Sequence, residues 1–279
     1  MAGLDGLSIN LATVREQFGL PQAVEACRRL GISAIAPWRD QVAKVGLAEA
    51  ARIVRDNGMR VTDLCRGGMF PAATAQGRQA AIDDNRRAID EAAALSADAL
   101  VLVCGGLPDR SRDIADARKM VRDGIAAILP YAKAAGIPLA IEPLHPMYAA
   151  DRACVNTLEQ ALDLCDELGE GVGVAIDTYH VWWDPKLHAQ IARARGRILA
   201  HHICDWLVPT KHLLLDRGMM GDGVIDFRPI RRAIEAAGYH GPQAVEILSE
   251  AWWQRPGEEV LRLCVERYNS LCRLDGANE

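Results

Sequence analysis

Four apolar runs in the second half of the sequence end in, or contain, side chains that bind cations. Glu142 and Asp177 each close one run, Glu246 lies in the last, and another contains the pair His201 and His202. Carboxylates with one imidazole are typical ligands of Mn²⁺, Mg²⁺ or Co²⁺, and Zn²⁺ also accepts them. Three carboxylates packed together repel one another unless a positive charge neutralises them. If the fold brings the runs together, they predict one divalent metal, with Mn²⁺ as the first expectation.

The elements that must position these residues alternate between strand and helix. Apolar runs predict strands at 7–11, 32–37, 60–64, 99–104, 139–142, 172–177, 198–204 and 243–247. Amphipathic stretches predict helices at 20–30, 47–57, 78–95, 114–135, 158–168, 185–195, 227–237 and 258–271. Eight such pairs without a linker fit a single (β/α)8 TIM barrel domain over residues 1–279. A doubly wound sheet shows the same alternation, but it favours a Gly-rich phosphate loop after the first strand, and none is present.

In a barrel the carboxyl ends of all strands surround one mouth, where catalysis takes place. The long predicted connections 65–76 and 205–226 leave strands three and seven at that mouth and are candidate active-site loops. Trp38, Trp182 and Trp206 follow the ends of predicted strands two, six and seven. Because flat aromatic faces stack on the C–H faces of sugar rings, these tryptophans predict a small carbohydrate substrate.

Composition excludes several other classes of protein. The chain has 279 residues and a net charge of −5, with no cluster of lysines and arginines, which argues against nucleic-acid binding. No apolar run is long enough to predict a membrane span, and the N-terminus does not resemble a signal peptide. The eight cysteines are scattered without a metal-binding or disulfide spacing, so we expect reduced thiols and a cytoplasmic protein.

With these motifs in place, the chain resembles the xylose-isomerase-like barrel superfamily of sugar phosphate isomerases and epimerases. The shared motifs are IEPLHP from Ile141, AIDTYH from Ala175, HICD from His202, GDGVIDF from Gly221 and VEI from Val245. The resemblance covers nearly the whole chain. It implies that the metal ligands are Glu142, Asp177, His202 and Glu246. His202 is preferred to His201 by the His-x-x-Asp spacing, and His180 matches a position that contacts the substrate in ketose epimerases.

The resemblance also implies a reaction. A divalent metal would polarise a sugar carbonyl, and a proton would be removed from the adjacent carbon to give a metal-stabilised cis-enediolate. In the epimerase version, Glu142 and Glu246 are the catalytic residues and flank the reacting carbon from opposite faces, one removing and one returning the proton. Relatives are often dimers or tetramers, so a homo-oligomer is expected.

His145 leaves a second reaction open. It follows Glu142 in the EPLHP motif and is an additional candidate base. A related branch of the superfamily, the metal-bearing subunits that cleave C-glycosides after oxidation to a 3-keto sugar, looks similar at this position. That alternative makes the protein a metal-dependent lyase or dehydratase with His145 as the base, acting with a second type of subunit.

The segment 206–221 departs from simple ketose epimerases. Its apolar LLL and MM segments are consistent with a lid or an oligomer contact, and a solvated excursion is the plainer alternative. Lys211, His212 and Arg217 in this segment are candidates for holding an anionic group, and Arg217 is predicted to contact the substrate.

Overall fold

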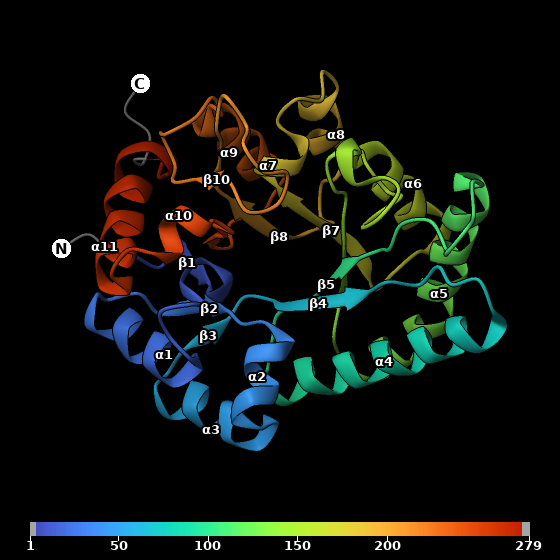
Figure 1. The fold of residues 1–279 in the computed structure, drawn as a ribbon, viewed down its shortest axis with the longest axis horizontal. Helices are drawn as coiled ribbons and strands as arrows, with labels where there is room; N and C mark the ends of the chain where they lie inside the picture. Colours follow the sequence, from blue (N-terminus) through green and yellow to red (C-terminus); the bar gives the residue numbers. More distant parts are fainter. Residues whose placement is uncertain (1–3, 275–279) are drawn as a thin grey trace.

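The computed structural model describes residues 4–274, which form a barrel of parallel strands surrounded by helices (Figure 1). The strands pair in the order β3-β2-β1-β11-β8-β7-β6-β5-β4. Their bounds are β1 (Leu7–Asn10), β2 (Ala34–Ala36), β3 (Arg60–Val61), β4 (Leu64–Gly68), β5 (Leu100–Val103), β6 (Leu139–Glu142), β7 (Val172–Asp177), β8 (Ile198–Ile203) and β11 (Gln243–Val245). The predicted (β/α)8 barrel is confirmed.

The third barrel strand consists of two pieces. β3 pairs with β2 on one side, whereas β4 pairs with β5 on the other. An isolated parallel bridge between Trp38 and Cys65 joins the β2 side to β4 and closes the ring. Two short antiparallel strands, β9 (Asp205–Trp206) and β10 (Arg217–Gly218), pair at the base of the long loop after β8.

The helices lie around the outside of the strands, as Figure 1 shows. The longer ones are α1 (Leu20–Arg29), α2 (Arg39–Val45), α3 (Leu47–Asp56), α4 (Ala75–Ala94), α5 (Ile114–Ala135), α6 (Leu158–Leu168), α8 (Leu187–Arg193), α9 (Phe227–Ala236) and α11 (Gly257–Arg267). Single turns are α7 (Thr178–Val181), α10 (Glu250–Trp253), η1 (Leu11–Val14) and η2 (Pro146–Tyr148), and a π-helical segment, η3 (Tyr268–Cys272), follows α11. The large apolar side chains fill the layer between strands and helices.

The barrel interior is lined by smaller side chains. Ala140 of β6, Ala175 of β7 and Ala200 of β8 belong to one buried cluster with Cys65 and Val101. Because side chains alternate between the two faces of a strand, the residues two positions further along these strands also point inward. Those residues belong to the charged motifs at the mouth. The alternation therefore places the candidate ligands one layer above an alanine floor.

The predicted end of the third strand is wrong. The segment 65–68 was expected to be an exit loop, because glycines weaken strands, yet Cys65 to Gly68 belong to β4. A β-carbon on Gly67 would lie 2.6 Å from Asn85 Oδ1, and one on Gly68 would lie 2.0 Å from the Val103 carbonyl oxygen. The two glycines thus permit a close approach to β5 and α4, and the strand continues through a register shift between Cys65 and Gly67.

Two further properties bear on the predictions from composition. Within residues 4–274, no helix is both long enough and apolar enough to cross a membrane. All eight cysteines are buried free thiols, as the scattered spacing predicts.

Candidate metal centre

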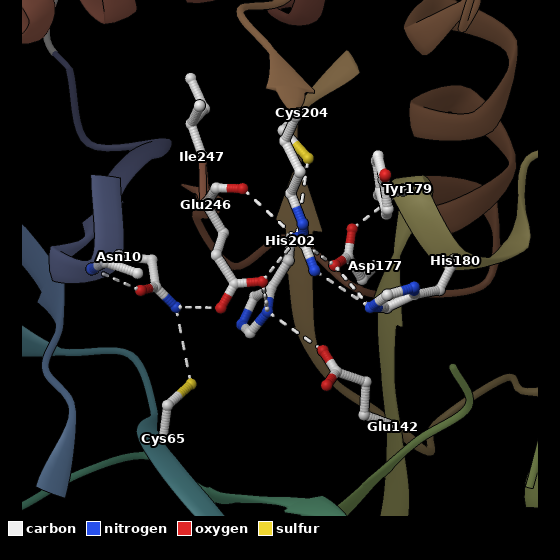
Figure 2. Close-up of polar contacts among 12 residues, drawn as sticks. Asn10, Cys65, Glu142, Asp177, Tyr179, His180, His202, Cys204, Glu246 and Ile247 are labelled. Carbon is white, nitrogen blue, oxygen red and sulfur yellow. Dashed lines mark hydrogen bonds and ion pairs between the residues drawn. The ribbon is translucent and has the colours of Figure 1, made fainter. Parts of the chain in front are cut away.

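The carboxyl ends of four consecutive barrel strands bring the predicted ligands together. Glu142 ends β6, Asp177 ends β7, His202 lies near the end of β8, and Glu246 follows β11. One donor atom from each of the four lies within 4.8 Å of the others, and all four residues are buried. Figure 2 shows Glu142 and Glu246 reaching toward His202 from different sides. His201 points to the opposite face of β8, as alternation requires.

Each of three ligands has one polar atom fixed by a neighbour, which leaves another atom directed at the centre. The backbone N–H of Tyr179 donates to Asp177 Oδ1 at 2.9 Å. The side-chain amide of Asn10 donates to Glu246 Oε1 at 2.8 Å. His202 Nε2 faces Asp63 Oδ1 at 3.3 Å, so its Nδ1 faces Glu142 at 3.4 Å. Such outer contacts orient metal ligands in proteins.

Two atoms of this cluster fit a bound cation particularly well. Glu142 Oε1 and His202 Nδ1 are both buried, and although they lie 3.4 Å apart neither forms a hydrogen bond. An unsatisfied buried polar atom costs free energy, and coordination of a cation would remove that cost. The donor set of carboxylates and one imidazole suits a divalent metal. A second group, Asp63, Cys65 and His202, overlaps the first at His202.

Burial and mutual charge shift the pKa values of these groups. Burial raises the pKa of Glu246 to about 7, against the opposing charges of Arg217 and His202. Burial lowers the pKa of His202, but the adjacent Asp63 and the two glutamates outweigh it and hold the pKa well above its ordinary value. For Asp177 the nearby positive charges, Arg217 first, outweigh burial and lower the pKa. Near neutral pH, protons therefore compete with a cation for Glu246 and His202.

Arg217 bridges two of the candidate ligands and also contacts His180. Its Nη1 donates to Asp177 Oδ2 at 2.9 Å and to Glu246 Oε2 at 2.8 Å. Its Nη2 lies 3.1 Å from His180 Nε2, and its guanidinium stacks 4.5 Å from the centre of the Tyr179 ring. Burial lowers the pKa of His180 to about 3, so this imidazole is neutral and accepts the hydrogen bond from Arg217.

A cavity opens beside the cluster. Some of the residues predicted to contact the substrate line it, and others do not. Trp38, His180 and Arg217 line the cavity together with Glu142 and Glu246. The indole N–H of Trp38 donates to Asn10 Oδ1 at 2.7 Å, which in turn fixes the orientation of the Asn10 amide.

Trp182, Trp206 and His145 lie outside the lining of this cavity. Trp206 stacks on Tyr179 with ring centres 4.7 Å apart and on His145 at 4.8 Å. Trp182 lies 5.8 Å from Trp206 and lines a separate surface hollow. Direct contact of these three side chains with a substrate stays a prediction.

The segment 207–216 contacts the cavity through one residue and is held there by two tyrosines. Leu214 lines it, and the carbonyl of Leu213 accepts a hydrogen bond from the hydroxyl of Tyr148 and another, at 3.3 Å, from Tyr179. Of the alternatives for this segment, a lid, an oligomer contact or a solvated excursion, these contacts favour the lid. Lys211 and His212 are exposed and lie outside the cavity lining, in contrast to Arg217.

Asp205 of the His-x-x-Asp motif has a structural role. Its carboxylate accepts hydrogen bonds from the backbone N–H groups of Gly221, Gly223 and Ile225, at 2.8 to 3.0 Å. It therefore holds the GDGVIDF segment against the end of β8. The Asp of the His-x-x-Asp motif, three residues after His202, thus fixes the loop that follows β8.

The structure adds four residues that the sequence motifs did not indicate: Asn10 and Asp63, which orient ligands, and Arg66 and Arg152, which line the cavity. Asn10 ends β1, and Asp63 lies between β3 and β4. A polar residue at the end of a barrel strand is the signal that these two share with the ligands. The arginines carry no such signal, because one lies in a segment expected to be a loop.

The family model described as a xylose isomerase-like TIM barrel matches residues 24–266, and the chain belongs to this family. Protein SMc04130 from Sinorhizobium meliloti 1021, whose crystal structure is known, has 69% sequence identity to this chain. The two structures match with a TM-score of 0.96 over 96% of this chain and 99% of that chain. The structure of an IolI protein with a bound zinc atom shares the fold, with 20% identity, a TM-score of 0.82 and coverage of 94% and 96%.

One curated relative that matches about half of this chain is a sugar epimerase. The L-ribulose-5-phosphate 3-epimerase UlaE of Shigella flexneri serotype 5b (strain 8401) is 26% identical over 151 residues. That match covers 53% of this chain and 49% of the relative, so the chain spans about half the length of the curated relatives it matches. In this chain, the donor set of Glu142, Asp177, His202 and Glu246 is of a kind that could hold a divalent metal.

Proposed function

We propose that this member of the xylose isomerase-like family is a divalent-metal-dependent epimerase or isomerase of keto sugars. The observation that carries the proposal is the cluster of Glu142, Asp177, His202 and Glu246, whose donor atoms lie within 4.8 Å of one another. Its carboxylate-rich donor set favours Mn²⁺, with Mg²⁺, Co²⁺ and Zn²⁺ as alternatives. The relationship to a sugar epimerase supports the substrate class.

The proposed reaction uses two carboxylates that approach the cavity from different strands. Glu142 comes from β6 and Glu246 from the end of β11, with β7 and β8 between them in the barrel. One glutamate removes the proton from the carbon beside the carbonyl, and the other returns a proton on the opposite face. A bound divalent cation would stabilise the negative charge that develops on the carbonyl oxygen. His180 and Arg217, which line the same cavity, orient the substrate hydroxyls.

The hydrogen bonding of His145 supports epimerisation over the lyase alternative. Its Nδ1 accepts a hydrogen bond from the backbone N–H of Met147 at 3.2 Å. Burial lowers the pKa of His145, so the ring is neutral near pH 7 and its proton lies on Nε2. Neither nitrogen then has a free lone pair to take a proton from a substrate, and the side chain lies outside the cavity lining.

The test combines metal analysis with proton exchange. Purified protein is expected to contain about one divalent metal per chain and to exchange deuterium from D₂O into a ketose. Glu142→Ala is expected to lose both properties, whereas Glu170→Ala, which removes an exposed carboxylate before β7, keeps both. His145→Ala is expected to retain exchange. Metal-free protein that still exchanges deuterium would contradict the proposal, and loss of activity in His145→Ala would favour the lyase.

A further inference from the structure

Two arginines line the same cavity without an acidic partner. Arg66 lies on β4, and Arg152 lies in the loop after β6. Within residues 4–274, neither side chain forms an ion pair or donates a hydrogen bond. Arg152 Nε is buried without a hydrogen-bond partner, and its guanidinium lies 5.7 Å from the centre of the Tyr148 ring.

Neighbouring arginines at the mouth are paired, so the absence of partners is particular to these two. Arg15 forms an ion pair with Asp40, and Arg39 pairs with Asp84 and Glu91 at 2.8 and 2.6 Å. Arg15, Arg39 and Arg66 line one open hollow, which adjoins the cavity at Trp38, Cys65 and Arg66. The two ion-paired arginines there have structural partners, whereas Arg66 has none.

Placing two unpaired cations near one another costs free energy. Burial, followed by the positive charge of Arg152, lowers the pKa of Arg66 below its ordinary range, and the weaker attraction of Glu142 does not offset it. A cationic side chain that is partly removed from water is stabilised by an anion in contact with it. Arginine pairs in a cavity are suited to planar oxyanions, because each guanidinium donates two parallel hydrogen bonds.

We infer that Arg66 and Arg152 form a subsite for the carboxylate of the substrate, which makes the substrate a keto sugar acid. The inference deepens the proposed function and rests on it for the chemistry at the other end of the molecule. Arg66 lies on β4, across the barrel from His202 on β8, and Arg152 lies in the loop that follows Glu142 on β6. A substrate held at both ends would have its carbonyl at the cluster and its carboxylate at the arginines.

The charges of the mouth favour a carboxylate over a phosphate. Four buried acids belong to the ligand cluster or contact His202: Asp63, Glu142, Asp177 and Glu246. A fifth buried acid, Asp205, is held by three backbone N–H groups and is not counted with them. Arg217 and a divalent cation together supply three positive charges against these four. Arg66 and Arg152 then leave one positive charge in excess, which a carboxylate neutralises and a dianionic phosphate exceeds.

Three matched ligands without a reactive carbonyl test the subsite by calorimetry of the Mn²⁺-loaded and the metal-free protein. D-gluconate and D-sorbitol differ only in a carboxylate at C1, and sorbitol 1-phosphate places a phosphate at that same end. Gluconate is expected to bind about tenfold or more tightly than sorbitol. Equal affinities for gluconate and sorbitol, or tighter binding of sorbitol 1-phosphate than of gluconate, would overturn the carboxylate assignment.

Variants locate the preference on the two arginines. Arg66→Met and Arg152→Met are each expected to reduce the gluconate preference about tenfold, whereas Arg66→Lys retains part of it. Arg15→Met removes a nearby ion-paired arginine and is expected to keep the preference. Because neither Arg66 nor Arg152 has an acidic partner, the thermal midpoints of their variants should not fall.

A gluconate preference that survives in both Met variants would place the carboxylate elsewhere and overturn the subsite. Failure of the proposed function has a different signature. A protein that prefers gluconate through Arg66 and Arg152, but exchanges no deuterium with any keto sugar, would retain the subsite and contradict the epimerase.

Discussion

Charged side chains of the described residues are paired on one side of the barrel mouth and lack acidic partners on the other. On the side of β7, β8 and β11, ionisable groups contact partners of opposite charge, with Arg217 between Asp177 and Glu246. On the side of β4 and the loop after β6, Arg66 and Arg152 lack an acidic partner among residues 4–274. The first side is internally paired and pre-oriented, whereas the second leaves its charge available for a ligand.

This difference separates stability from function. Removing one member of a buried ion pair leaves the other charge uncompensated and typically costs about 3–5 kcal/mol. Substitutions on the side where the charges are paired therefore affect folding as well as chemistry. Removing an unpaired arginine leaves no acid uncompensated, so its effect falls on ligand binding. The contrast can be tested by comparing stability and activity for variants on the two sides.

The largest effect is expected for Glu246→Gln. The amide keeps the shape of the side chain and its contact with Asn10, but it loses the negative charge that faces His202 and Arg217. Turnover is expected to fall by about a thousandfold or more, because the variant loses both a proton-transfer group and a metal ligand. Steady-state kinetics and metal analysis measure the two losses.

Glu250→Gln is the matched control, because Glu250 is exposed four residues further along. It is expected to keep full turnover and metal content. Near-normal turnover in Glu246→Gln would instead show that the paired charges are structural. Glu246 would then have no role in proton transfer or metal binding.

The affinity of the cluster for a metal should depend on pH. The binding of an anion by Arg66 and Arg152 should not. The pKa of Glu246 is raised to about 7, and that of His202 is also raised, so the metal-free site holds protons near neutral pH. A cation must displace them, and its affinity therefore rises with pH. We expect about a tenfold change per pH unit for each proton released, between about pH 6 and pH 8.

The same shift has the opposite sign for the stability of the metal-free protein. A carboxyl group whose folded pKa lies above its unfolded value favours folding when protonated, and this contribution is lost as pH rises from about 4.5 to about 7. Mn²⁺ titrations at several pH values, together with proton release measured in buffers of different ionisation enthalpy, check the affinity. An affinity independent of pH would show that the cluster binds no metal through Glu246 and His202.

Much of the paired side was predictable from the sequence because its strands are buried on both faces. The bounds of β6 and β7 agree with the apolar runs that end at Glu142 and Asp177. In such strands the alternation of side chains fixes which residue enters the barrel, and the ligands follow from the strand ends. Asn10 and Asp63 were not predicted, because their roles depend on side-chain contacts with residues far away in the sequence.

The other side was less predictable because its backbone depends on close packing. Gly67 and Gly68 resemble a loop locally, and only their contacts with α4 and β5 show why the strand continues. The adjacent Arg66 was consequently treated as part of a loop. The helix α2 was also missed, because only Gln41 and Val42 in it are buried and it lacks an apolar stripe.

The smallest effect is expected at the segment 207–216, the proposed lid, whose Leu213 carbonyl accepts hydrogen bonds from Tyr148 and Tyr179. Tyr148 lines the cavity, and its hydroxyl donates to the carbonyl of Leu213 in the segment 207–216. Tyr148→Phe removes one hydrogen bond to the lid while keeping the ring beside Arg152. Amide hydrogen exchange in 207–216 is expected to accelerate about two- to tenfold, since one such bond contributes roughly 0.5–1.5 kcal/mol.

Tyr131→Phe provides the control, because the Tyr131 hydroxyl donates to Asp90 at 2.7 Å on the surface between α4 and α5. Its variant should leave exchange in 207–216 unchanged. If the lid closes over bound substrate, Tyr148→Phe raises KM several-fold with a smaller change in kcat, because binding gains less from closure. Unchanged exchange in Tyr148→Phe would mean that Tyr179, whose hydroxyl also donates to Leu213, holds the segment by itself. The lid would then be fixed from the paired side of the mouth alone.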